Sequence, residues 1–312
     1  MILTITLNAA VDNALFLPRL QVGDANRVTR VDRDAGGKGV NQSRVIAELG
    51  GRTMATGFLG GPEGTFIRQV LDTAGVDHDF VETGDPTRTN FSVEDDSKQP
   101  PTTFNLPGPT VTADEWAGLL ARCRELGDQA AWVSMAGSLP RGVPADAYRT
   151  LAGIFAGRRA RVMLDADDEP MRLGLESKPD FIKPNQNEAA RLLGWSIASD
   201  EDATGAAIEL RRFCSEDGFV VLSRGAAGAV LASPAGVWIG RSPDVDVKST
   251  MGSGDSMIGG ILWAMEAGKP MEEAFAWGLA AGAATAATDG TKIAGQEAIQ
   301  TLVPQATVRK VG

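Results

Sequence analysis

The sequence predicts an α/β fold in which a mostly parallel central sheet carries helices on both faces. Short apolar runs, typical of buried strands, alternate with segments whose apolar residues recur every three to four positions, as in amphipathic helices. The chain has 312 residues, 43% of them hydrophobic, which is enough for one large α/β domain or two modest ones. Its 37 glycines and an aromatic content of only 6% suit tight turns and closely packed helices.

The individual elements follow from these patterns in chain order. Apolar runs predict strands at residues 2–7, 54–59, 131–135, 162–164, 181–182 and 219–222. Helical periodicity predicts helices at residues 40–49, 65–74, 114–126, 145–155, 188–193, 203–214, 256–267 and 271–287. The chain is therefore expected to become strongly helical after Asp255.

Two segments, 12–34 and 87–106, break this alternation. They lack helical periodicity and contain alternating stretches such as Asn90-Phe91-Ser92-Val93, which predict antiparallel strands outside the main sheet. A small β-layer built from both segments could cover an active site as a lid. The alternative is that both segments are long surface hairpins.

Composition limits the partners of the chain. There are 30 basic and 40 acidic residues, a net charge of −10, which argues against a basic face for nucleic acid. No apolar run approaches the ~18 residues of a membrane span, and residues 1–8 resemble a first strand rather than a signal peptide. Cys123 and Cys214 stand alone, which favours a reducing, cytoplasmic location. One histidine, His78, leaves little room for Ser-His-Asp chemistry or His-rich metal sites.

The first motif with chemical content is Gly252-Ser253-Gly254-Asp255, directly before a predicted helix. Backbone amides at a helix start attract anions, and glycine lets the backbone approach a phosphate closely. The alternative interpretation of Asp255 is an ordinary helix cap. The dinucleotide fingerprint is missing because Met257 replaces its third glycine, and no phosphate-binding Gly-x-x-x-x-Gly-Lys-Ser/Thr motif occurs.

Two further motifs place polar side chains three residues apart at helix starts. Lys38 and Asn41 follow the glycine turn that includes Gly37, stand three residues apart, share one face of the first turn, and could bind a sugar or a phosphate; a flexible glycine turn with a solvated lysine is the alternative. Asn185 and Glu188 follow a predicted strand, and by themselves they are typical of a structural capping box.

The remaining motifs lie where predicted strands end. The stretch 223–228 is either a glycine-rich hairpin or a backbone cradle for nucleotide phosphates. Ser138 and Asp12 each follow a strand, and ligands bind at the carboxyl ends of strands in open α/β sheets.

In this order the motifs resemble those of the ribokinase-like, or PfkB, family of carbohydrate kinases, and the resemblance runs from end to end. Residues 36–41 are similar to its N-terminal signature, 249–256 to its C-terminal signature, and 183–188 to its Asn-x-x-Glu element. The chain looks closest to the branch of 1-phosphofructokinase and tagatose-6-phosphate kinase, with support from 57–61, 87–90 and 136–140. The resemblance implies one domain over 1–312, a three-layer α/β/α sandwich with a small β-sheet lid at about 12–34 and 87–106.

The resemblance also implies a reaction and its catalytic groups. MgATP would donate a phosphoryl group, and Asp255 would take the proton from the acceptor hydroxyl. The amides of Gly252, Ser253 and Gly254 would hold the charge of the transferring group. Glu188 would help to hold Mg²⁺, through water. The acceptor would be a ketohexose phosphate, with fructose 1-phosphate converted to fructose 1,6-bisphosphate; the alternatives are tagatose 6-phosphate and fructose 6-phosphate.

The family pattern also assigns the binding residues. The sugar would contact Asp12, Gly37, Lys38, Asn41 and Ser138, and its existing phosphate would contact Arg88, with Arg27 and Lys38. The nucleotide would contact Lys183, Asn185, Ser223, Arg224, Gly225, Ala226, Ala227, Gly228 and Gly254. The family often forms dimers through the lids, so a homodimer is expected.

The chain departs from the family pattern at several positions. Arg224 replaces a usual leucine and could touch the nucleotide, and Ala166-Asp167-Asp168-Glu169 replaces a common Ser-Gly-Glu stretch. A non-catalytic sugar-phosphate sensor on the same fold is the alternative of another class. Its expected mark, a lost base or a broken glycine turn, is not found, since Asp255 and both glycines are present.

Overall fold

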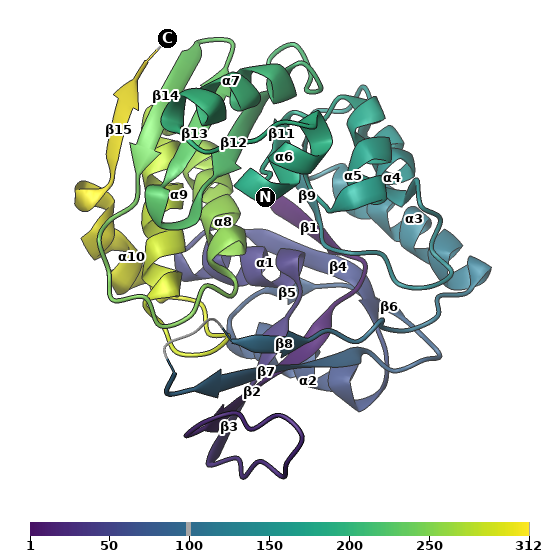
Figure 1. The fold of residues 1–312 in the computed structure, drawn as a ribbon. Coiled ribbons are helices and arrows are strands. Elements are labelled where there is room, and N and C mark those ends of the chain that lie inside the picture. Colours follow the sequence, from purple (N-terminus) through teal and green to yellow (C-terminus); the bar gives the residue numbers. More distant parts are fainter. Residues whose placement is uncertain (98–100, 312) are drawn as a thin grey trace.

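A computed structural model describes residues 1–97 and 101–311. Its main feature is a twisted central sheet covered by helices, with a second, smaller sheet at one end (Figure 1). The parallel strands of the central sheet are β1 (Ile2–Thr6), β4 (Thr53–Leu59), β9 (Trp132–Ala136), β10 (Arg161–Asp165), β11 (Phe181–Ile182) and β12 (Phe219–Ser223). Short strands β5 (Asp77–His78) and β6 (Val81–Glu82) both pair with β4. The predicted α/β class with a mostly parallel sheet is confirmed.

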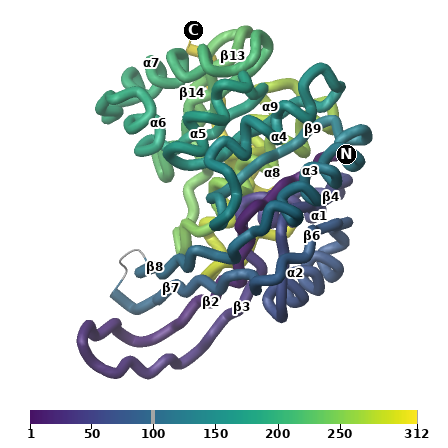
Figure 2. Tube along the Cα trace, turned by 90° about the vertical axis from the view of Figure 1, so that its right-hand side faces the viewer, coloured from purple at the N-terminus to yellow at the C-terminus, as the bar shows by residue number. Residues whose placement is uncertain are grey.

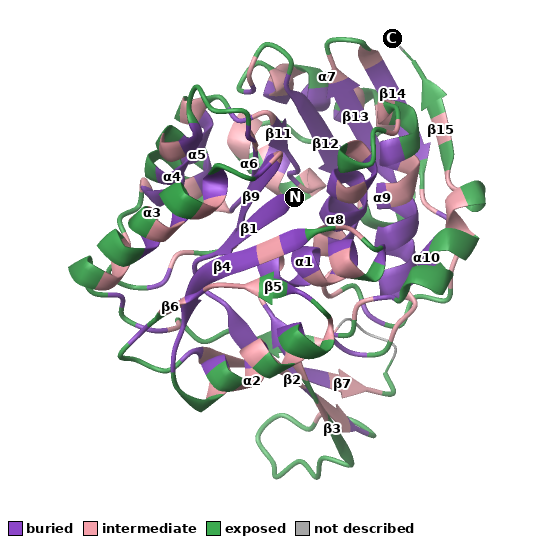
Figure 3. Ribbon diagram, turned by 180° about the vertical axis from the view of Figure 1, so that it is seen from behind, coloured by how far each residue is buried: buried purple, intermediate pink, exposed green. Residues whose placement is uncertain are grey.

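The central strands alternate between two cores because successive side chains point to opposite faces. In β12, Val220 and Leu222 pack into the core with helices α3, α4 and α7, whereas Phe219 and Val221 pack into the core with α8 and α9. All five residues of β1 are buried, and Figure 3 shows the central strands as buried over most of their length. Burial on both faces explains why these strands appear in the sequence as continuous apolar runs.

The helices lie close to the predicted positions. They are α1 (Lys38–Glu48), α2 (Gly61–Thr73), α3 (Ala113–Gly127), α4 (Ala147–Phe155), α6 (Gln186–Leu193), α7 (Asp200–Arg211), α8 (Ser253–Glu266) and α9 (Met271–Ala286). The short helices α5 (Asp168–Gly174) and α10 (Gln296–Leu302) lie outside the predicted ranges. None of the described helices has both the length and the apolar character needed to cross a membrane.

Beyond β12 the central sheet continues in three antiparallel strands, and the last of them interrupts the helical stretch expected after Asp255. Strands β13 (Ala229–Ser233), β14 (Gly236–Arg241) and β15 (Thr307–Lys310) extend the sheet antiparallel to β12 and to one another. The last strand is mostly exposed, so it has no apolar run that the sequence could reveal.

The second sheet has the order β3-β2-β7-β8, built from β2 (Ala10–Leu17), β3 (Arg30–Gly36), β7 (Arg88–Asp95) and β8 (Thr102–Phe104). Figure 2 shows it extending from one end of the molecule, with the β2–β3 connection at its far end. Both predicted segments contribute, although residues 98–100 of the segment 87–106 lie outside the described residues.

The prediction of antiparallel pairing in this sheet is only half right. The β2–β3 and β7–β8 pairs are antiparallel, but β2 and β7 pair in parallel. The two strands are reached from β1 and from the β4 side of the central sheet, and β1 and β4 run parallel. Both chain segments therefore enter the small sheet in the same direction.

Candidate active site

Helix α8 begins at a glycine instead of a side-chain cap. Its N-cap Gly252 has a φ of 72°, a left-handed conformation that glycine adopts without steric strain. In the described part of the chain no side chain caps this end, so the first amides of α8 are available to bind an anion. The hydroxyl of Ser253 is also buried and has no hydrogen-bond partner among the described residues.

Asp255 stands in the first turn of α8 but does not act as its cap. Its Oδ2 accepts a hydrogen bond of 2.9 Å from Nδ2 of Asn41 on α1. Burial raises the pKa of Asp255 to about 6, with a further upward contribution from Asp165 that Lys38 partly offsets. The carboxyl group is thus ionised at neutral pH and binds a proton more readily than an exposed aspartate.

Asp165, the last residue of β10, joins two lysines beside this carboxylate. Its Oδ1 lies 3.4 Å from Nζ of Lys38 and 3.9 Å from Nζ of Lys183, and its side chain is 3% exposed. Burial alone would lower the pKa of Lys38, but Asp165 and then Asp167 outweigh this effect and raise it, so Lys38 is charged. A Cβ built on Gly254 would lie 3.4 Å from Nζ of Lys183, which places this lysine at the start of α8.

Asn185 and Glu188 form a complete capping box at the start of α6. Oδ1 of Asn185 accepts from the amides of Asn187 and Glu188, and Glu188 Oε2 accepts from the amide of Asn185 at 2.7 Å. The structural interpretation of this motif is confirmed. Burial, and next the carboxyl of Asp167, raise the pKa of Glu188 to about 7, so its carboxylate is poorly stabilised.

These carboxylates are the residues that could hold Mg²⁺. Across the described residues, no group of three or more His, Cys, Asp or Glu side chains is arranged to enclose a metal ion. Mg²⁺ usually binds proteins through one or two carboxylates, waters and substrate phosphates. Glu188 fits this mode, because a bound cation would stabilise its carboxylate and reverse the upward shift of its pKa. Asp165 beside it fits this mode as well.

The stretch 223–228 is a tight connection between β12 and β13, so the hairpin interpretation is confirmed. Gly225 and Gly228 have positive φ values of 56° and 84°. Ser223 pairs with Asn185 in a parallel bridge, which brings this connection next to the start of α6. The predicted nucleotide residues 183, 185 and 223–228 therefore lie on adjoining strand ends of the central sheet.

The predicted sugar residues gather between the small sheet and α1. Oδ1 of Asp12 accepts a hydrogen bond of 2.9 Å from Asn90, and burial raises the pKa of Asp12. A Cβ on Gly36 would lie 1.8 Å from Oδ2 of Asp12, so only glycine leaves room for this carboxylate. Gly37, with a φ of 115°, turns the chain into α1 and thus presents Lys38 and Asn41.

Arg88 lies at the edge of this group, but its donors are partly used. Its Nη1 donates to the carbonyl of Leu106 at 2.8 Å, and its Nη2 donates to the carbonyl of Asn8 at 3.0 Å. Its Nε is buried and has no partner within the described residues. The side-chain Nδ2 of Asn8 also donates to the hydroxyl of Ser138 at 3.1 Å, so Asn8 contacts Arg88 through its backbone and Ser138 through its side chain.

Arg27 is the predicted site residue that the structure does not bring to the others. It is exposed in the long connection between β2 and β3, which projects from the molecule (Figure 2). The sequence analysis missed Asp165, Asn8 and Asn90. Asp165 and Asn8 follow the rule that pointed to Asp12 and Ser138, since both lie at the carboxyl ends of strands.

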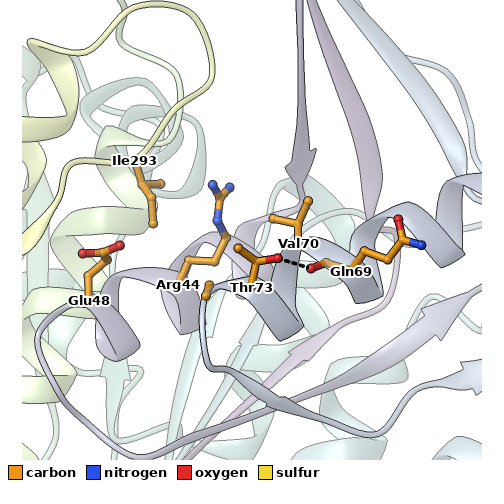
Figure 4. A pocket seen from close by; sticks show the side chains of 7 residues that line it. Arg44, Glu48, Gln69, Val70, Thr73 and Ile293 are labelled. Carbon is orange, nitrogen blue, oxygen red and sulfur yellow. Dashed lines mark hydrogen bonds between the residues drawn. The ribbon is translucent and has the colours of Figure 1, made fainter.

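Two cavities adjoin the described elements. The smaller, about 220 Å³, lies between α5 and α6 and includes Glu188 in its lining. The larger, about 380 Å³, lies away from Asp255 between α1, α2 and Ile293 (Figure 4). Arg44 in this larger cavity is already bound to Asp34 and to the carbonyl of Ala35, so it offers no free positive charge to a ligand.

Known proteins resemble this chain over most or all of its length. Residues 3–298 match the model of the pfkB family carbohydrate kinases. The chain is 31% identical over 311 residues, covering 100% of both chains, to a 1-phosphofructokinase of Bacillus subtilis strain 168. Its structure resembles that of phosphofructokinase-2 from Escherichia coli in complex with substrates and products, with a TM-score of 0.91 and 28% identity over 97% of this chain and 98% of that one.

A more distant likeness concerns the fold alone. The ribokinase of Thermotoga maritima has a TM-score of 0.76 at 18% identity, over 97% of this chain and 99% of that one. The predicted ribokinase-like fold is confirmed, and so is the predicted enzyme class, a phosphotransferase with an alcohol group as acceptor. Because the family model matches residues 3–298, the chain belongs to the pfkB family of carbohydrate kinases.

Proposed function

We propose that this protein transfers the γ-phosphoryl group of ATP to a ketohexose phosphate, with fructose 1-phosphate as acceptor and fructose 1,6-bisphosphate as product. The observation that carries the proposal is Asp255, a carboxylate held by Asn41 beside the uncapped amides of α8. A proton acceptor and an anion-binding helix start are thereby joined in one turn.

Each step of the proposed reaction involves particular residues. The acceptor hydroxyl attacks the γ-phosphorus, a new O–P bond forms, and the bond to the bridging oxygen of ADP breaks. The hydroxyl proton passes to Asp255, and the amides of Gly252, Ser253 and Gly254 stabilise the charge on the transferring group. Positioning and charge stabilisation account for most of phosphoryl transfer, so a carboxylate of modest basicity is sufficient.

The acceptor assignment rests on two kinds of support. Asp12, Ser138, Asn41 and Arg88 place hydroxyl-binding and anion-binding groups in one region. A relative covering the whole chain is named a 1-phosphofructokinase. Tagatose 6-phosphate and fructose 6-phosphate are the competing acceptors, and the solved relative is named a phosphofructokinase-2.

Mg²⁺ belongs to the proposal as the ion that neutralises the nucleotide phosphates. Glu188 and Asp165 would hold it, together with waters and the phosphates. Lys183 and the connection 223–228 would hold the nucleotide itself.

A substrate panel tests the proposal. ADP release is measured with fructose 1-phosphate, fructose 6-phosphate, tagatose 6-phosphate, free fructose and free ribose, each with ATP and Mg²⁺. We expect the highest kcat/KM with fructose 1-phosphate. Absence of turnover with every ketohexose phosphate would refute the acceptor class, and a higher kcat/KM with a 6-phosphate would move the assignment to that sugar.

Asp255→Asn tests the role of the base. The variant keeps the shape of the side chain but cannot accept the proton, so we expect kcat to fall by about 10²–10⁴. Binding of a fluorescent ATP analogue should stay within about twofold of the unsubstituted protein. A near-normal kcat would remove Asp255 from the base role.

We further propose that the small sheet is a lid over the acceptor, and that two chains associate through it. One face of the sheet carries Asp12 and Asn90, which are opposite one another in register. The other face carries Val31, Phe91 and Phe104, which are 54%, 36% and 54% exposed. A face of this kind suits a second copy of the chain.

A further inference from the structure

Asp200, the first residue of α7, binds two arginines, one directly after β12 and one at the end of β14. One carboxylate oxygen contacts Nη1 of Arg224, just after β12, and the other contacts Nη2 of Arg241, at the end of β14. The side chain of Arg224 is only 8% exposed. A carboxylate that uses both oxygens on two guanidinium groups fixes them relative to each other.

The two arginines lie on either side of the connection 225–228. Arg241 donates from Nη1 to the carbonyl of Ala227 at 2.7 Å, so one guanidinium holds both Asp200 and the connection. The amide of Arg224 donates to the carbonyl of Gly228 at 2.8 Å and thereby closes the turn. The backbone of Gly228 also lies against β14, since a Cβ there would be 2.1 Å from the carbonyl oxygen of Gly240.

Asp200 is not needed to cap its own helix. The capping box of α7 is made by Ser199 and Asp202, whose side chains bind the amides of that turn. The two arginines hold the pKa of Asp200 below its usual range, as expected for a carboxylate that serves them. The position therefore has a purpose outside α7.

We propose that Asp200, Arg224 and Arg241 form a clamp that sets the conformation of the connection 225–228 for a nucleoside triphosphate. Asp200 is a positioning residue: it acts on the nucleotide through the two arginines. This inference rests on the proposed function, in which the connection belongs to the ATP site. It also gives a role to Arg224, one of the predicted nucleotide residues.

The test compares Asp200→Asn with Asp202→Asn, a matched control in the same turn. Asp200→Asn weakens both charged hydrogen bonds, so we expect the KM for ATP and the dissociation constant of a fluorescent ATP analogue to rise about tenfold. The KM for the sugar phosphate and kcat should change less than about twofold. Asp202→Asn damages the helix cap but leaves the clamp intact, so it should lower the melting temperature without changing the KM for ATP.

A double-variant experiment separates the clamp from a general loss of structure. Arg241→Gln should raise the KM for ATP as Asp200→Asn does. The double variant should show little further increase, because both substitutions remove the same ion pair between Asp200 and Arg241. Equal losses in the KM for ATP and for the sugar phosphate, or fully additive losses, would overturn the clamp.

The analogue titration needs no sugar, so its outcome is independent of the acceptor. If the protein binds the analogue but phosphorylates no ketohexose phosphate, the proposed acceptor fails and the clamp is still tested. If Asp200→Asn binds the analogue as tightly as the unsubstituted protein, the clamp fails while the proposed acceptor is unaffected.

Discussion

At the scale of single residues, the proposed role of Asp255 as the base predicts how activity depends on pH. A base must be unprotonated to accept the hydroxyl proton, and burial raises its pKa to about 6. We therefore expect kcat, measured with saturating substrates and Mg²⁺, to be flat above pH 7 and to fall up to tenfold per unit below about pH 6.

A substitution can test whether the fall of kcat at low pH comes from Asp255. Lys38 lowers the pKa of Asp255, so Lys38→Met should move this fall of kcat to higher pH. Saturating Mg²⁺ keeps Glu188, whose pKa is also raised, in its ionised form. A kcat that stays constant from pH 7 to pH 5 would contradict the role of Asp255 in this pH dependence.

The buried charge of Asp255 should lower the free energy of unfolding at neutral pH. An aspartate whose pKa rises from 3.8 to about 6 on folding stabilises the folded state at low pH and loses that contribution as pH rises through about 6. Two pKa units correspond to about 3 kcal/mol. Asp255→Asn should therefore raise the free energy of unfolding at pH 7.5 by up to about 3 kcal/mol, and this gain should shrink as the pH falls from about 6 to about 4, as measured by urea denaturation.

Asp202→Asn provides the control of opposite sign. Backbone hydrogen bonds hold the pKa of Asp202 below its usual value, so its contribution to stability is present at neutral pH and is lost in acid. The variant should be less stable at pH 7.5. If both variants shift stability in the same direction, the buried charge of Asp255 does not explain the effect.

How well single residues could be predicted depended on where they stand in the chain. Asp255, Lys38 and Asn41 follow glycine turns at helix starts, and such turns leave a clear sequence pattern. The bond between Asn41 and Asp255 joins residues 214 positions apart, and no local pattern could reveal it. Asp165 was missed because a buried aspartate at the end of an apolar strand looks like the start of an ordinary loop.

At the scale of elements, Arg44 ties helix α1 to the small sheet. From α1 it binds the carboxylate of Asp34 at 3.1 Å and the carbonyl of Ala35 at 2.9 Å, both in β3, and Figure 4 shows it beside the cavity between α1 and α2. The side chains of this pair are only 12% and 13% exposed. Arg44→Gln would leave Asp34 charged and unpaired by arginine, at a cost of about 3 kcal/mol of unfolding free energy.

The same substitution should weaken acceptor binding, because Asp34 lies opposite Asp12 in register. We expect the KM for the sugar phosphate to rise while the KM for ATP is unchanged. Arg68→Gln is the control, since Arg68 pairs with Glu82, which is 67% exposed, and such pairs contribute less than about 1 kcal/mol. Equal stability of the two variants in urea denaturation would show that Arg44 does not anchor the sheet.

Elements were predictable to the extent that they are buried. Strands such as β1 and β12 are enclosed by helices on both faces and therefore stand out as apolar runs. Strand β15 lies at an exposed edge and was not found, and the parallel pairing of β2 with β7 depends on contacts between distant segments. Local composition carries neither kind of information.

At the scale of the whole molecule, the charge of −10 and the proposed anionic substrates require an explanation. At one end of the central sheet, Lys38 and Lys183 flank Asp165, and the first amides of α8 have no side-chain cap. An acidic protein can therefore bind phosphates locally while its remaining surface repels other anions.

Association through the small sheet is the last expectation at this scale. Its outer face, with Val31, Phe91 and Phe104, would be shielded from water in a dimer and would also hold the proposed lid in place. Phe104→Glu should place a charge in this interface, shift the protein to monomer in light scattering after size exclusion, and raise the KM for the sugar phosphate. Phe213→Glu is the matched control, because Phe213 is 39% exposed but lies after α7, away from the small sheet. A Phe104→Glu protein with unchanged mass would show that this face is not the interface, and a monomeric variant with unchanged KM would separate association from the lid.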